Sequence, residues 1–273
     1  MAENKLFSII MPCYNVEDYV DRAIRSVMAQ TVDKSLFELI TVNDASTDDT
    51  LKHLYEWANR FPNTVKVITY DTNIRQGGAR NLALKASVGE YICFLDSDDW
   101  IEPDALESYL TVLNVEKWDI ITTKHEENYE YGIIYGNDTK KKDIHIVKSF
   151  SSGNIRDYIQ EDLGFVWASI YRRTIILDNK VVFPEHMAYE DICWQRLIKY
   201  YASRACITNK LTHHHFNHPG STMNSKNARH HIDRLASYEM LLKELSERNL
   251  LTISYSDVLR DTIETYYFNT GAG

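Results

Sequence analysis

The stretch Tyr91–Trp100, YICFLDSDDW, decides the fold of this chain. Its first five residues are mostly apolar, which is typical of a buried strand, and the abrupt polarity after Leu95 marks where that strand leaves the core. On an extended backbone Asp96 and Asp98 project to the same side. Carboxylates this close repel each other unless a cation lies between them. The pattern predicts a strand end that holds Mg²⁺ or Mn²⁺ on a diphosphate. The alternative is an acidic turn that caps the next helix near Pro103.

Strands and helices alternate along the first half of the chain. The apolar runs predict strands over residues 6–11, 37–42, 65–70 and 91–95, the first of them closed by Pro12, which cannot continue a central ladder. The helices between them are expected to begin after Asn15 as a cap, at Ser46 or Thr47, and at Gln76, with the last one ending near Gly89. This alternation is typical of a parallel sheet with crossover helices.

Ligands bind such sheets in a crevice at the carboxyl ends of the strands. Tyr14, Asp44 and Asp96 each follow directly after a predicted strand. We therefore expect these three side chains to converge on one crevice.

The pattern is less regular after residue 123. Residues 125–148 are polar, and the charge run Lys140-Lys141-Lys142 within them is predicted to be a solvated loop. Strands are expected over 165–171 and 205–211, and a helix at Glu190-Asp191. From about Asn227 the sequence is typical of two amphipathic helices separated near Asn249. The apolar face of the second helix has three candidate contacts: the domain itself, a membrane surface, or a second copy of the chain, which we favour.

Composition excludes several classes of protein. The chain has 273 residues, is 44% hydrophobic and carries a net charge of −9, so a general nucleic-acid binder with a basic stripe is not expected. Its four cysteines are scattered, which favours free thiols in a reducing compartment. No signal peptide and no membrane-length apolar run is recognisable. We expect a cytoplasmic protein that could work at the inner face of the membrane.

Five segments carry a resemblance to a known family. They are SIIMPCYN at 8–15, VNDASTD at 42–48, GARN at 78–81, GEYICFLDSDD at 89–99 and YED at 189–191. In this order and spacing, over about residues 6–222, the chain resembles the inverting family 2 glycosyltransferases of the GT-A fold.

The resemblance implies an α/β fold with a GT-A-like, Rossmann-type, mostly parallel sheet, flanking helices and a C-terminal helical extension. It implies a GT-A domain at 1–222, with a nucleotide-binding half at 1–119 and an acceptor-binding half at 120–222, and an extension at 223–273.

The same resemblance implies roles for individual residues. In the donor site Tyr14 would stack on the base, Asp44 would accept a hydrogen bond from it, which favours uracil, and Arg80 would lie near the phosphates. Asp98 would bind the divalent metal directly, and Asp96 would contact the ribose or the metal. Asp191 would be the catalytic base. The other donor-site residues implied are Pro12, Asn15, Ser97 and Ser221, the last in a loop that helps close over the diphosphate.

Each role has a plainer alternative. Asp191 could be a carboxylate favoured by the dipole of its helix. Tyr14 could be an ordinary half-buried aromatic, and Arg80 could pair with any surface acid.

Three positions depart from the family pattern, and one motif is ambiguous. Asn43 stands where the family often has an aspartate, and Phe216 and His218 stand where related sequences often carry arginines. The run His213-His214-His215 suggests zinc, but consecutive residues on a strand point to opposite faces and lack the paired spacing of structural zinc sites. One of these three histidines could instead complete the shell of the catalytic metal.

The sequence therefore predicts an inverting transferase with Mn²⁺ or Mg²⁺ as cofactor. It would move a sugar from a nucleotide diphosphate donor, with uridine as the favoured nucleoside, to a saccharide or lipid-linked acceptor in surface polysaccharide or glycoconjugate synthesis. Two other functions remain open, a sugar nucleotidyltransferase, whose glycine-rich N-terminal loop is absent here, and a non-catalytic nucleotide-sugar-binding module. Peripheral membrane contact and a homodimer also remain open.

Overall fold

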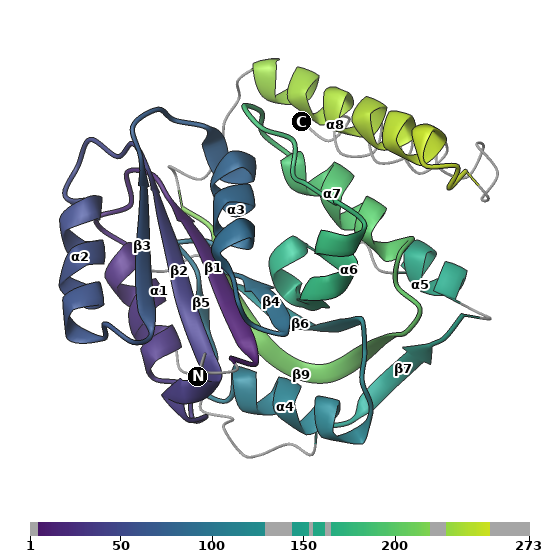
Figure 1. The fold of residues 1–273 in the computed structure, drawn as a ribbon, viewed down its shortest axis with the longest axis horizontal. Helices are drawn as coiled ribbons and strands as arrows, with labels where there is room; N and C mark the ends of the chain where they lie inside the picture. The colour runs from purple at the N-terminus through teal and green to yellow at the C-terminus, as the bar shows by residue number, and fades with distance from the viewer. Residues whose placement is uncertain (1–4, 129–143, 153–154, 162–164, 219–227, 252–273) are drawn as a thin grey trace.

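The fold is taken from a computed structural model, which describes residues 5–128, 144–152, 155–161, 165–218 and 228–251 (Figure 1). One large mixed sheet runs through the described residues, in the strand order β3-β2-β1-β4-β8-β6-β9-β5, with β7 paired to β9. Helices cover both faces of this sheet (Figure 1). The α/β class with flanking helices is thus confirmed.

The first four strands are parallel, as the sequence predicts. They are β1 (Phe7–Cys13), β2 (Phe37–Asp44), β3 (Val65–Tyr70) and β4 (Tyr91–Phe94). Because side chains alternate along a strand, Ile9 and Met11 of β1 join the core on one face of the sheet, whereas Ile10 joins the core on the other.

The second half of the sheet is mixed. Strand β8 (Ser169–Arg172) is antiparallel to both β4 and β6 (Ile120–Asn128), and β9 (Ala205–Phe216) is parallel to β6. The short strands β5 (Trp100–Ile101) and β7 (Ile146–Phe150) are antiparallel to β9. Strand β8 therefore joins the two halves of the sheet.

The helices divide between the two faces. One core contains buried residues of α1 (Val20–Met28), α2 (Thr50–Arg60) and α4 (Ala105–Val115). The other contains residues of α3 (Arg75–Ala86), α5 (Ile155–Glu161), α6 (Arg173–Asp178), α7 (Glu190–Lys199) and α8 (Ala228–Glu247). Single 3₁₀ turns lie at Lys34–Leu36 and Val166–Ala168.

The predicted end of the first strand is wrong. Strand β1 continues through Pro12, which pairs with Val42 of β2, and ends at Cys13. The pairing of β1 with β4 stops at Ile10. Pro12 therefore lies where β1 has a single paired neighbour, a position that tolerates a residue without an N–H group.

Two predicted helix starts are also wrong. Helix α1 begins at Val20, and Asn15 adopts a left-handed conformation with φ of 51° instead of capping it. Helix α2 begins at Thr50, whose backbone N–H donates to Asp48 Oδ1 at 3.0 Å. The loops after β1 and β2 are thus longer than predicted, and the site below uses both.

Both ends of the polar segment 125–148 are strands, and the loop predicted at Lys140-Lys141-Lys142 lies outside the described residues. Strand β6 continues to Asn128, where it pairs with the second half of β9, and β7 begins at Ile146. Strand β9 in turn extends to Phe216, beyond the predicted end at residue 211. These polar residues form strands because a distant segment supplies the hydrogen-bonding partner, which local sequence does not reveal. Residues 129–143 lie outside the described residues.

The first C-terminal helix is confirmed as α8, which packs on α7. Ser237 Oγ accepts the backbone N–H of Cys193 at 3.1 Å, and Asp233 accepts that of Ala188 at 3.0 Å. The predicted second helix lies outside the described residues, and the boundary at residue 222 stays a prediction. In the described parts of the chain, no helix combines the length and apolar character needed to cross a membrane.

Candidate functional site

The loops after β1 and β2 hold each other at the carboxyl edge of the sheet. Asn15 Oδ1 accepts the backbone N–H of Thr47 at 2.8 Å, and the backbone N–H of Asn15 donates to Ser46 Oγ at 3.1 Å. The neighbouring Tyr14 is 48% exposed. Asn15 therefore shapes the crevice, and Tyr14 presents an accessible ring there.

Asp44 lies buried at the end of β2. Its Oδ1 accepts the backbone N–H of Ile74 at 2.8 Å, and burial raises the pKa of its carboxyl group. Beside it in sequence, Asn43 is 3% exposed, and its Oδ1 has no hydrogen-bond partner in the part of the chain that the structure describes. An unpaired buried carbonyl is costly, so this oxygen is a candidate acceptor for a ligand N–H.

Arg80 of α3 joins two carboxylates that are far apart in sequence. Its Nη2 donates to Asp96 Oδ1 at 2.7 Å, and its Nη1 donates to Glu190 Oε1 at the start of α7. The Arg80 and Glu190 side chains are almost fully buried. Burial alone would lower the pKa of Arg80, but these carboxylates outweigh it and raise the pKa. The guanidinium is thus held between carboxylates, which is not the surface pairing considered above.

Asp191 lies next to this pair, in the first turn of α7. Burial raises the pKa of its carboxyl group. The positive charge of Arg80 lowers this pKa, and the negative charge of Asp96 raises it further. The backbone N–H groups at the start of the helix lower it. A carboxylate with a raised pKa is better able to accept a proton.

Asp98 faces a histidine that the sequence did not predict as a partner. His218 Nε2 lies 3.0 Å from Asp98 Oδ2, and Arg22 of α1 donates to the Asp98 carbonyl oxygen at 2.5 Å. The His218 ring lies 4.6 Å from the ring of Tyr19 and 5.3 Å from that of Phe216. The sequence marks His218 only as a departure from the family pattern. It does not indicate the contact with Asp98, because the two residues are 120 positions apart.

The third acidic residue, Asp99, ties the strand end to β9. It is fully buried, and its Oδ1 accepts the backbone N–H of Phe216 at 2.8 Å. His213 Nε2 lies 3.2 Å from Asp99 Oδ2, and His215 Nδ1 lies 3.3 Å from its Oδ1. Burial would raise the pKa of Asp99, but the hydrogen bonds of both histidines outweigh it and lower the pKa to about 2.

The three consecutive histidines alternate between faces, as expected of a strand. His214 Nε2 lies 2.6 Å from Glu102 Oε1, and the His214 ring stacks on Trp100. These contacts lie away from those of His213 and His215. Over the described residues, no three side chains among His, Cys, Asp and Glu are arranged to hold a metal ion by themselves.

The remaining predicted residues have other surroundings. Ser97 is buried beside the Cys13 thiol, under the turn that carries Asp96 and Asp98. Burial raises the pKa of all four cysteine thiols, which leaves them protonated. Pro12 is part of β1, and Ser221 lies outside the described residues.

Residues 8–227 match the family model described as glycosyl transferase family 2. The chain belongs to this family. It is therefore a glycosyltransferase, and its fold and motifs agree with the resemblance drawn from the sequence.

Relatives of this family 2 enzyme include bacterial glycosyltransferases. The putative glycosyltransferase EpsH of Bacillus subtilis is 30% identical over 259 residues, covering 91% of this chain and 72% of EpsH. The poly(ribitol-phosphate) β-N-acetylglucosaminyltransferase TarS of Staphylococcus aureus is 28% identical over 248 residues. That match covers 88% of this chain but only 41% of TarS.

Solved structures share the fold of this family 2 enzyme. The structure of S. aureus TarS 1–349 in complex with UDP-GlcNAc matches with a TM-score of 0.77 at 24% identity, covering 97% of this chain and 73% of that one. A mannosyltransferase of Pyrobaculum calidifontis in complex with GDP-Man and Mn²⁺ matches with a TM-score of 0.62 at 14% identity, covering 97% and 70%.

Proposed function

We propose that this glycosyltransferase transfers a sugar from a UDP-linked donor to a hydroxyl acceptor, with inversion at the anomeric carbon and with a divalent metal. The observation that carries the proposal is the arrangement around Arg80. This one buried guanidinium holds Asp96, at the donor strand end, beside Glu190 and the neighbouring Asp191.

The donor base would bind between the loops after β1 and β2. Tyr14 offers an exposed ring for stacking, and Asp44 offers a buried carboxylate to an N–H group of a base. One such acceptor suits uracil, which presents a single ring N–H at its pairing edge. The complex of the structural neighbour TarS with UDP-GlcNAc supports this choice of nucleotide.

The residues present fit a divalent metal. Asp98 offers carboxylate oxygens and His218 an imidazole nitrogen next to them, a donor set that Mn²⁺ accepts together with phosphate oxygens. Asp96 is engaged by Arg80, so we assign the direct contact to Asp98, with His218 beside it. When bound, the metal would stabilise the negative charge that develops on the departing diphosphate. The Mn²⁺ in the mannosyltransferase neighbour supports this cofactor.

Asp191 would act as the base. It would take the proton from the acceptor hydroxyl as that oxygen attacks the anomeric carbon and the bond to the diphosphate breaks. Burial and the neighbouring Asp96 raise the pKa of Asp191, which makes its carboxylate a better proton acceptor. Glu190 is fixed by Arg80 and would orient the first turn of α7 rather than accept the proton.

The proposed acceptor is a saccharide or lipid-linked saccharide of a surface polysaccharide or glycoconjugate. The name of TarS, a poly(ribitol-phosphate) β-N-acetylglucosaminyltransferase, supports a polymeric acceptor. The other functions considered above have no specific observation in their favour.

Asp191→Asn tests the assignment of the base. We expect the release of UDP from a UDP-sugar, supplied with its acceptor, to fall by about 10²- to 10⁴-fold, while UDP binding stays unchanged. Asp178→Asn, at an exposed position on α6, is the matched control and should keep wild-type activity. Unchanged turnover in Asp191→Asn would refute the role of base, and formation of pyrophosphate instead of UDP would point to a nucleotidyltransferase.

A further inference from the structure

A continuous stack of aromatic rings lies in the second half of the sheet. The Phe165 ring lies 4.7 Å from the Trp167 ring, with their planes 2° apart. The other side of the stack is formed by His213 and His215, whose rings lie 4.5 Å and 5.5 Å from that of Trp167. His125 of β6 meets Phe165 and Trp167 edge-on at 5.3 Å and 4.9 Å.

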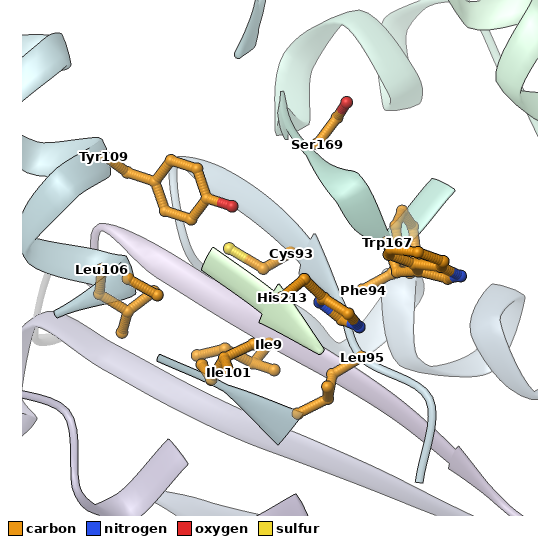
Figure 2. A pocket seen from close by; sticks show the side chains of 11 residues that line it. Ile9, Cys93, Phe94, Leu95, Ile101, Leu106, Tyr109, Trp167, Ser169 and His213 are labelled. Atoms are coloured by element: carbon orange, nitrogen blue, oxygen red, sulfur yellow. The ribbon is translucent and has the colours of Figure 1, made fainter. Parts of the chain in front are cut away.

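The inner end of this stack lies against the candidate site. His213 and His215 both contact Asp99, the residue that follows Asp98. Trp167 and His213 line a small cavity together with Leu95, which immediately precedes Asp96 (Figure 2). The stack therefore begins directly beneath the turn that carries the acidic residues.

The outer end of the stack reaches solvent. Trp167 is 6% exposed, whereas Phe165 is 37% exposed. One face of the Phe165 ring is covered by Trp167, so its exposed area belongs to the opposite face and the rim. Burial and the neighbouring charges of His213 and His215 lower the pKa of His125. At neutral pH the group beside this exposed ring is consequently an uncharged imidazole.

We propose that Phe165 and His125 form a subsite that binds a pyranose ring of the acceptor. The subsite rests on the proposed transferase function and specifies its acceptor as a ring-bearing saccharide. A pyranose presents several C–H groups on one face, and these polarised hydrogens are attracted to the negative face of an aromatic ring. The neutral imidazole can both donate and accept a hydrogen bond with the sugar hydroxyls at the rim.

The position of the stack favours the acceptor over the donor. The residues proposed for the donor base, Tyr14 and Asp44, belong to loops of the first half of the chain, whereas Phe165 and His125 belong to the second. Trp167 and His215 connect the exposed ring to the Asp98–Asp99 turn, so a sugar on Phe165 would be the outer sugar of an acceptor whose reacting end reaches that turn. An acyclic polyol such as ribitol has no flat C–H face to place on this ring.

Saturation-transfer NMR on the full chain tests the subsite. The probes are methyl β-D-glucopyranoside, methyl β-D-galactopyranoside and methyl N-acetyl-β-D-glucosaminide, with ribitol as the ring-free comparison, each with and without UDP and Mn²⁺. We expect transfer to the ring protons of at least one pyranoside and none to ribitol. In Phe165→Ala we expect the affinity for that pyranoside to fall by about two- to tenfold, the size of one aromatic contact.

Three controls make the result specific. Phe165→Trp keeps an aromatic face and should restore binding, whereas Phe165→Leu, apolar but not aromatic, should not. Tyr55→Ala removes a ring of 48% exposure from α2, on the other side of the sheet, and should change nothing. The UDP-induced rise in melting temperature should be the same in all these variants, because none of them touches the donor site.

Several outcomes would overturn the subsite. These are no transfer to any pyranoside, equal transfer to ribitol, or pyranoside affinity that Phe165→Ala leaves unchanged. Failure of UDP to bind would instead refute the proposed function. Pyranoside binding measured without nucleotide still decides the subsite in that case.

Discussion

At the scale of single residues, the site depends on buried ionisable side chains that contact one another in small groups. Arg80, Asp96 and Glu190 form one such group, and Asp99 with His213 and His215 forms another. A buried charge is stable only while its partner is present, because removing one member leaves the other without solvent or counter-charge. The site residues are therefore also residues on which the stability of the fold depends.

Arg80→Gln tests the first group. We expect the free energy of unfolding to fall by about 3–5 kcal/mol, since Asp96 and Glu190 lose their shared cation. Adding Glu190→Gln to this variant should restore part of the loss, because it removes one uncompensated carboxylate. Urea unfolding of the four members of this double-mutant cycle measures the effect. Strictly additive losses would contradict the pairing.

A second residue-scale prediction concerns pH and lies away from the site. Burial alone would raise the pKa of Glu38, but hydrogen bonds from Lys66, Ser8 and the backbone N–H of Val88 outweigh it and lower the pKa. A pKa lower in the folded than in the unfolded state adds stability that is present above the unfolded pKa, about 4.3. That stability is lost as the pH falls through the folded pKa.

Glu38→Gln should therefore flatten the dependence of stability on pH between about 6 and 3. Urea unfolding of the variant and the wild type across this range measures the difference. An equally steep loss of stability in both proteins would show that Glu38 does not contribute to it.

At the scale of elements, the close approach of α3 to the segment before α7 sets the distance between the two halves of the site. Gly77 of α3 makes this approach possible, because a Cβ atom there would lie 2.0 Å from the Pro184 carbonyl oxygen and 3.1 Å from Glu190 Cγ. Helix α3 carries Arg80, and α7 begins with Glu190. Any displacement between these elements changes the Arg80 contacts directly.

Gly77→Ala should accordingly destabilise the protein by about 1–3 kcal/mol through overpacking and reduce turnover through the displaced carboxylates. Lys85→Ala, at an exposed position of the same helix, is the control and should stay within about 0.5 kcal/mol of wild type. Thermal unfolding and UDP release measure the two effects. Wild-type turnover in Gly77→Ala would mean that the spacing of α3 and α7 does not position the site.

The elements also show which features can be predicted from sequence. Strand β4 and the acidic turn after it can be predicted from local sequence, because an apolar run followed by alternating aspartates indicates both. The start of α7 at Glu190 is also predicted from local sequence. The extension of β6 to Asn128 depends on pairing with β9, almost ninety residues further along the chain. Likewise, the pairing of Asp98 with His218 and of Arg80 with Glu190 spans more than a hundred residues. Such partners are chosen by the fold, so local patterns predict the acidic residues but not what they contact.

At the scale of the whole molecule, the residues proposed for the donor and for the acceptor lie in different halves of the sheet. Tyr14, Asp44 and Asp96 lie at or just after the ends of the parallel strands β1, β2 and β4, whereas β6 carries His125 and β9 carries the histidines that hold Asp99. The seam between the halves, at β4 and β8, lies beside the acidic turn. We propose that a uridine nucleotide, with its base between the loops after β1 and β2, extends to this turn and is bound there through a metal held at Asp98.

The melting temperature of the protein with UDP, measured with and without Mn²⁺, tests this metal-dependent nucleotide binding most directly. UDP at a hundredfold excess over its dissociation constant should add about 2.7 kcal/mol of stability. We predict that this shift requires Mn²⁺, disappears in Asp98→Ala and persists in the control Asp178→Ala. A shift that is independent of Mn²⁺ and unchanged in Asp98→Ala would contradict the role of Asp98 as metal ligand. The absence of a shift with any nucleotide would contradict nucleotide binding itself.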